Sequence, residues 1–218
     1  MKYYTAEQVA VHNDASDCWV SLLGKVFDLT KLLNDNKGPL AEPLAKAAGT
    51  DISHWFDKET GEPLTHVDPI SNLRTYYTPY GRFLHVAPPT DPSGSFSMAH
   101  DKPWWSDDQY VIGSLSTNTR KVRFINTLTK QEHVLTVPAE ETCEELLTRY
   151  LPFNHHAQSY TWKTLDAKTQ EMKELDMKQT LVENEVVDES SKFVDLRIKD
   201  DYYVPAIYLY FNDDLTVA

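Results

Sequence analysis

Glycine is scarce in this chain, with 7 among 218 residues, whereas an average protein of this length carries about 15. There are 12 prolines, without any collagen-like period. So few glycines exclude collagen-like repeats and Gly-rich linkers. They also disfavour nucleotide-binding folds that cradle phosphate in a loop with several glycines.

Cysteine and long apolar runs are also lacking. The two cysteines, Cys18 and Cys143, are far apart in the chain and cannot build a disulfide framework or a thiolate zinc site. No segment approaches the ~18 consecutive apolar residues of a membrane-spanning helix, and the first residues do not form a signal peptide. We expect a soluble protein of a reducing compartment that does not contact membranes.

Basic residues are outnumbered, with 21 Lys and Arg against 33 Asp and Glu, for a net charge of −12. Phosphate neutralisation needs clusters of Lys and Arg, so this balance argues against binding to nucleic acid or to an anionic membrane. The acidic surface favours protein partners.

One stretch breaks all periodicity, residues 86–105 (VAPPTDPSGSFSMAHDKPWW). It predicts a domain over 1–86, a connector over 87–117 and a second domain over 118–218. Within the connector, Trp104 and Trp105 have two interpretations. They are either a hydrophobic anchor packed onto one domain or an exposed contact for a partner.

The first half predicts a mixture of short helices and strands. Thr5 and Gln8 have the spacing of a helix capping box. A tight hairpin is indicated at Leu23 and Gly24. The expected elements are a helix over 5–12, strands over 18–22 and 25–29, a helix over 40–48 that ends at Gly49, and a strand over 76–86 weakened by Pro79.

The second half predicts a sheet with one helix. The expected elements are strands over 120–126 and 132–137, a helix over 140–151, and strands over 160–163 and 206–211. This order is the β-grasp pattern, a mixed sheet wrapped over a helix. Residues 175–186 (LDMKQTLVENEV) resemble the stretch before the last strand of ubiquitin-like domains. The fold class expected for the chain is α+β.

The first half carries three motifs in order, which are residues 4–13 (YTAEQVAVHN), 17–20 (DCWV) and 24–30 (GKVFDLT). Together with residues 48–56 (AGTDISHWF) they resemble the cytochrome b5 family. The resemblance implies a cytochrome b5-like fold for the first domain, and it raises the question of a heme.

The chain departs from that family at both usual heme ligands. Where the family has an axial histidine in a His-Pro-Gly-Gly turn, this chain has residues 36–39 (NKGP), with Lys37 at the histidine position. A protonated lysine cannot ligate iron. The second ligand is expected about five residues after Phe56, where the chain has Gly61.

Two other histidines are candidates for the missing ligands, His54 and His66. A longer loop could bring His66 to the vacated position, and a pair of neutral imidazoles would ligate heme b and support one-electron transfer. The alternatives are that His54 faces solvent on a helix and that His66 bonds to Asp68 in a turn. The other histidines are weaker candidates.

The two halves together resemble a two-domain branch of the cytochrome b5 family, in residues 102–105 (KPWW), 125–129 (INTLT) and 208–216 (YLYFNDDLT). This resemblance implies a non-catalytic structural or regulatory subunit of the motile-cilium axoneme. Its expected partners are radial spoke proteins and their neighbours on the doublets, and its expected location is the cilium. The alternative is a heme-binding redox sensor or one-electron carrier in the cilium.

Overall fold

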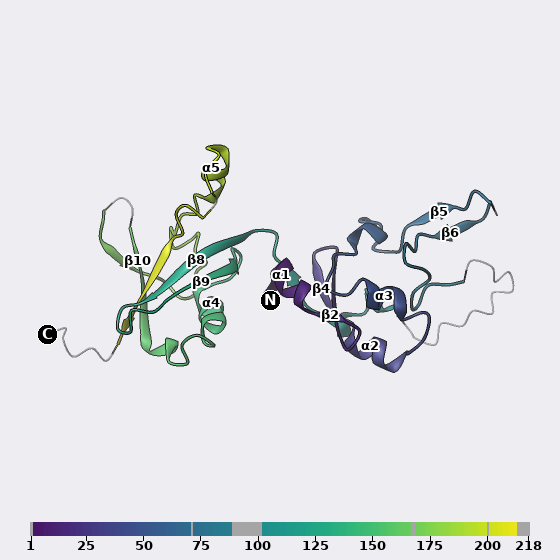
Figure 1. The fold of residues 1–218 in the computed structure, drawn as a ribbon, viewed down its shortest axis with the longest axis horizontal. Coiled ribbons are helices and arrows are strands. Elements are labelled where there is room, and N and C mark those ends of the chain that lie inside the picture. The colour runs from purple at the N-terminus through teal and green to yellow at the C-terminus, as the bar shows by residue number, and fades with distance from the viewer. Residues whose placement is uncertain (1, 71, 89–101, 167–168, 200, 213–218) are drawn as a thin grey trace. The chain divides into compact units, whose positions relative to one another are not determined.

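The chain divides into two compact units, residues 1–115 and 116–218. The computed structural model describes residues 2–70, 72–88, 102–166, 169–199 and 201–212 (Figure 1). The boundary corrects the predicted connector over 87–117. Its residues 102–115 fold as part of the first unit, and residues 89–101 lie outside the described residues.

The first unit is built on a five-stranded sheet with the order β1-β7-β4-β3-β2. β7 pairs antiparallel with β4 and parallel with β1, which ties the end of the predicted connector to this sheet. The strands are β1 (Tyr3–Tyr4), β2 (Asn13–Asp14), β3 (Asp17–Leu22), β4 (Lys25–Asp28) and β7 (Val111–Leu115).

Short helices cover the sheet of the first unit. They are α1 (Ala6–Val11), α2 (Thr30–Asp35), α3 (Glu42–Lys46) and the 3-10 turns η1 (Ser53–Trp55), η2 (Trp104–Ser106) and η3 (Asp108–Tyr110). The capping box of Thr5 and Gln8 is confirmed, as is the β3–β4 hairpin. Helix α3 is shorter than predicted. A Cβ at Gly49 would lie 2.9 Å from Asn13 Cβ, so only glycine allows this close approach.

The strand predicted over 76–86 is wrong. Only Tyr76 belongs to a strand, at the end of β6 (Arg74–Tyr76), which pairs with β5 (Thr65–Val67) in a hairpin that extends from the unit (Figure 1). The chain then turns at Gly81, whose amide donates to the carbonyl of Thr78 (3.0 Å). Phe83, Leu84 and Val86 follow and are buried, so burial and not strand pairing explains their apolar character.

The second unit has a mixed five-stranded sheet with the order β11-β10-β12-β8-β9. Its first and last strands, β8 and β12, are parallel neighbours, and the other pairs are antiparallel. The strands are β8 (Thr119–Asn126), β9 (Glu132–Pro138), β10 (Tyr160–Leu165), β11 (Met172–Glu174) and β12 (Ala206–Phe211).

One face of this sheet is covered by α4 (Cys143–Tyr150), which begins with a capping box of Thr142 and Glu145. Tyr150 stacks on Phe124 of β8 at a centroid distance of 4.8 Å, and Trp162 of β10 packs edge-on against the same ring. The predicted elements of this unit are present, at slightly different bounds. The sequence prediction missed β11, η4 (Ala157–Ser159) and α5 (Ser190–Asp195), which extends from the unit (Figure 1).

Candidate functional site

The interior of the first unit is filled by aromatic side chains. Trp104 is fully buried (0% exposed), and its ring lies 5.8 Å from Phe27, 6.0 Å from Phe56 and 6.2 Å from Phe83. Trp55 packs on Phe83 at 5.6 Å. These rings share one core with buried leucines of the two central helices, Leu32 and Leu33 of α2 and Leu44 of α3.

Trp104 is therefore the hydrophobic anchor and not an exposed contact. Trp105 packs beside it at 5.6 Å and is half-buried, and its indole Nε1 donates to Glu62 Oε2 (3.1 Å). A fully buried tryptophan contributes more apolar area to a core than any other side chain. The segment before β7 is thus a part of the core of the first unit.

His54 lies on η1, exposed, next to the buried Trp55. The indole Nε1 of Trp55 donates a hydrogen bond to Nε2 of His54 (2.9 Å). A nitrogen that accepts a hydrogen bond uses the lone pair that a metal would need. Among the described residues, the indole next to it in sequence is the group that holds this exposed imidazole.

His66 is also exposed, in the middle of β5. Its Nε2 lies 3.5 Å from Thr75 Oγ1 on the paired strand, and its ring lies 6.4 Å from Tyr77. The longer loop in which it was expected is the β5–β6 hairpin. The hairpin presents this histidine on its surface.

The positions of the usual heme ligands are also outside the core. Lys37 is exposed and lines a surface groove of about 400 Å³ beside Leu33 and Ala41. Gly61 occupies a tight turn with φ +70°, and its amide donates to Asp57 (2.9 Å).

The described residues do not fit a heme in the arrangement that the resemblance implies. Bis-histidine ligation needs two imidazoles that face each other across an apolar slot. In this unit Trp55, Phe56, Phe83 and Trp104 pack together in one core, and neither candidate histidine lines a cavity described here. Across the described ranges, no three His, Cys, Asp or Glu side chains gather as a metal site would require.

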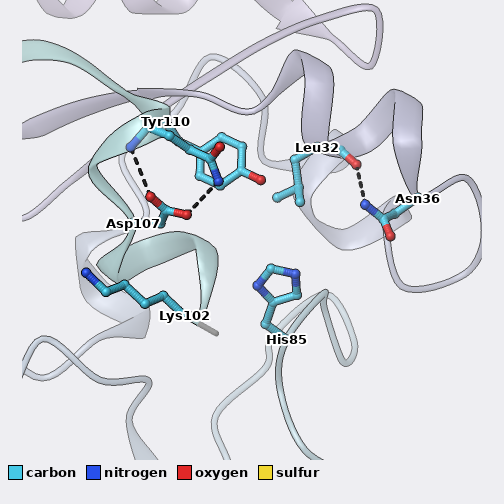
Figure 2. A pocket seen from close by; sticks show the side chains of 7 residues that line it. Leu32, Asn36, His85, Lys102, Asp107 and Tyr110 are labelled. Atoms are coloured by element: carbon cyan, nitrogen blue, oxygen red, sulfur yellow. Dashed lines mark hydrogen bonds between the residues drawn. The ribbon is translucent and has the colours of Figure 1, made fainter. Parts of the chain in front are cut away.

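A different histidine, His85, points into a cavity of about 430 Å³ at the end of α2 (Figure 2). Its φ of 71° is unusual for a residue other than glycine. The backbone amide of Trp104 donates to Nδ1 of His85 (2.9 Å), which fixes the proton of the neutral ring on Nε2. This bond holds the segment before the first tryptophan against the turn at residue 85.

The other walls of this cavity are polar and locally bonded. Figure 2 shows Tyr110 above His85, with Asp107 and Lys102 at the side. Asp107 accepts hydrogen bonds from the backbone and the side-chain amide of Gln109 (3.1 and 2.5 Å). Burial, reinforced by the charge of Asp107, raises the pKa of Tyr110 above its usual value. The phenol therefore stays protonated at neutral pH and can only take part as a hydrogen-bonding group.

Both cysteines are buried and free. Burial raises the pKa of Cys18 to about 12 and that of Cys143 to about 11. A nucleophilic cysteine needs a lowered pKa and access to solvent, so neither thiol has the surroundings of a reactive one.

Among the helices of the described residues, none is long and apolar enough to cross a membrane.

Sequence reasoning missed His85, because the conformation that turns its ring inward leaves no mark on the local pattern.

Comparison with known proteins identifies the family of the first domain. The family described as "Cytochrome b5-like Heme/Steroid binding domain" matches residues 5–77. The cytochrome b5 of Nicotiana tabacum is 43% identical over 56 residues, which cover 26% of this chain and 40% of that protein.

Several relatives match almost the whole length of the chain. The cytochrome b5 domain-containing protein 1 of Xenopus tropicalis is 50% identical over 216 residues, which cover 99% of this chain and 96% of that protein. The human protein of the same name is 48% identical over 216 residues, which cover 99% of this chain and 92% of that protein. The chain belongs to the family of cytochrome b5 domain-containing protein 1.

Proposed function

We propose that this chain is a non-catalytic structural or regulatory subunit of the motile-cilium axoneme, associated with the radial spokes. The observation that carries the structural role is the aromatic core of the first unit, in which Trp104 and Phe83 are buried side by side. A closely packed core of this kind supports the role of a rigid block. The ciliary location rests on the resemblance of the whole chain to the two-domain branch of the family.

A second proposal is that the second unit is a ubiquitin-like β-grasp domain. Its strand order supports this, since the first and last strands lie parallel at the centre of the sheet and one helix, α4, packs on one face. Domains of this kind bind partner proteins through an exposed sheet face. Here that face carries Lys121, Lys163, Tyr208 and Tyr210, and the Nζ of Lys163 lies 5.3 Å from the Tyr210 ring centroid.

Exposed apolar side chains support the role of a protein-bound subunit. The β5–β6 hairpin presents Val67, Leu73 and Ile70, and Ile70 is 94% exposed. Exposed apolar side chains that form a contiguous patch mark contact sites for other proteins. The hairpin is therefore the surface of the first unit that we assign to docking.

The test is fractionation of axonemes from ciliated cells that express the tagged chain. We expect the chain to remain in the axoneme after detergent extraction and to leave it together with radial spoke proteins when salt is raised. The variant I70D/L73D should lose this association, because it places charge on the docking surface. The matched control V194D, on an exposed position of α5 away from the sheet face, should retain it. Release of the wild-type chain independently of every spoke protein would contradict the proposal.

The alternative function is a heme-binding redox sensor or carrier in the cilium. The match of residues 5–77 to a domain described as heme- or steroid-binding supports it. In that case His54 and His66 are the candidate ligands. The variants H54A and H66A would each abolish a heme absorption band that the wild-type chain shows, whereas the exposed control H156A would keep it.

A further inference from the structure

A buried arginine in the second unit forms no ion pair with another described residue. Arg120 is 4% exposed and lies on β8, on the same strand face as the core residues Val122 and Phe124. Among the residues that the structure describes, no hydrogen-bond acceptor reaches its Nε or its Nη2. Buried charges in proteins are paired as a rule, since an unpaired one loses its hydration without compensation.

The two unpaired nitrogens of Arg120 share one edge of the planar guanidinium. This is the edge on which a carboxylate forms two parallel hydrogen bonds. The same unit shows such a pair. Arg149 donates from Nε to Glu141 Oε2 (2.5 Å) and from Nη2 to Oε1 (2.6 Å). Arg120 presents the same two donors with no carboxylate opposite them.

Arg120 is one of the residues that line a cavity of about 250 Å³, and its Nε and Nη2 are buried. Apolar side chains form most of the remaining wall, and two of them, Val182 and Val187, are exposed at its rim. The cavity is smaller than the pockets that hold drug-sized ligands, which measure about 300–1,000 Å³. It suits a group of the size of one side chain.

Two carboxylates also line the cavity, and neither pairs with Arg120. Glu185 forms an ion pair with Lys173 (2.5 Å), and Asp188 accepts a hydrogen bond from the backbone amide of Ser190 (3.0 Å). Burial lowers the pKa of Arg120, and the charge of Asp188 partly offsets this effect. The guanidinium stays protonated at neutral pH. The two acidic neighbours make the site unfavourable for a dianion such as phosphate.

We propose that the Arg120 cavity binds a monocarboxylate carried on a short aliphatic group, with the carboxylate on the Nε and Nη2 edge. The exposed valines at the rim favour a peptide segment of a partner protein as its source, because they extend the apolar contact beyond the cavity. The site belongs to the second unit alone and does not depend on the ciliary assignment.

The experiment is an NMR titration of the ¹⁵N-labelled full chain with isovalerate, with its uncharged analogue isovaleramide, with inorganic phosphate, and with the capped dipeptide acetyl-valyl-glutamate amide. We expect isovalerate to cause saturable shifts at the amides that line the cavity, Val182 and Val186 among them. Isovaleramide and phosphate should bind at least about tenfold more weakly, because the guanidinium edge then lacks a matching monoanion. Tighter binding of the dipeptide than of isovalerate identifies a peptide source, and equal binding identifies a free carboxylate.

The variant R120M should lose the saturable shifts while its thermal midpoint stays equal or rises, because methionine replaces an unpaired buried charge with an apolar group of similar length. The matched control R123M removes an arginine of the same strand whose ion pair with Glu132 is on the exposed face, and it should bind isovalerate as the wild type does. Equal affinity for isovalerate and isovaleramide in the wild-type chain would overturn the proposal, as would unchanged isovalerate shifts in R120M.

Discussion

Replacing Trp104 with alanine tests whether this residue is a core anchor. The side chain is fully buried and touches Phe27, Phe56, Phe83 and Trp105. Burial of about 200 Å² at about 25 cal/mol per Å² corresponds to about 5 kcal/mol, as an upper value. Trp→Ala changes in cores cost about 3–5 kcal/mol, so we expect W104A to lower the unfolding free energy of the first unit by about 4 kcal/mol.

The assay is urea unfolding followed by NMR signals resolved for each unit. With a denaturant dependence of about 2 kcal/mol per M, the midpoint of the first unit should fall by about 2 M. The signals of the second unit provide an internal control. The variant W104F should recover most of the loss, because it keeps an aromatic ring and removes an indole N–H that has no hydrogen-bond partner among the described residues. A loss below about 1 kcal/mol in W104A would refute the anchor role, since an exposed tryptophan costs little to remove.

Three further predictions concern groups outside that core. R149M should lower the unfolding free energy of the second unit by about 3–5 kcal/mol in urea titrations, because it leaves the buried Glu141 without its partner. A loss below about 0.5 kcal/mol, which is typical of an exposed ion pair, would contradict this prediction. Burial alone would raise the pKa of Glu140, but hydrogen bonds from the hydroxyls of residues 116 and 117 lower this pKa overall. The stabilising effect of the Glu140 carboxylate is therefore complete above its ordinary pKa of 4.5 and is lost as the pH falls through the lowered pKa. E140Q should therefore flatten the acid side of the stability profile, and an unchanged profile would argue against this carboxylate. Cys18 and Cys143 should react with a thiol reagent at pH 8 only after unfolding, because burial raises both pKa values; rapid labelling of the native chain would contradict their placement.

Local patterns in the sequence predicted most of the regular elements. The capping box at Thr5, the hairpin at Leu23 and Gly24, and the strands of the second half are set by short-range preferences, and all are present. The strand over 76–86 was mistaken, because apolar residues that enter a core from a loop produce the same composition as a buried strand. Short segments with tertiary contacts, such as β11, carried no local signal.

The connector was the main error of organisation. A stretch rich in proline, serine and aspartate indicated a linker as far as residue 117, but its apolar residues from Trp104 onward return to the first unit. Only the three-dimensional packing of Phe27 and Phe83 shows the space that the tryptophan fills. The expectation of a buried anchor was one of the two interpretations of the sequence, and it is confirmed.

The candidate sites were harder to predict. His54 and His66 were chosen by their distance along the chain from the lost ligands, which does not determine whether a side chain faces the core. For Arg120 the sequence does contain a signal of burial, which is its position in the strand. Arg120 alternates in phase with Val122 and Phe124, so a strict period of two places its guanidinium on the inner face of the sheet.

The first unit does not fit a bis-histidine heme, because His54 and His66 are exposed on two separate elements. The most direct measurement is the absorption spectrum of the purified full chain titrated with hemin under reducing and oxidising conditions. We predict that no saturable Soret band of a bis-histidine heme develops in either state. A stoichiometric band that H54A and H66A each abolish would contradict this, because it would require the two exposed imidazoles to face each other across a heme.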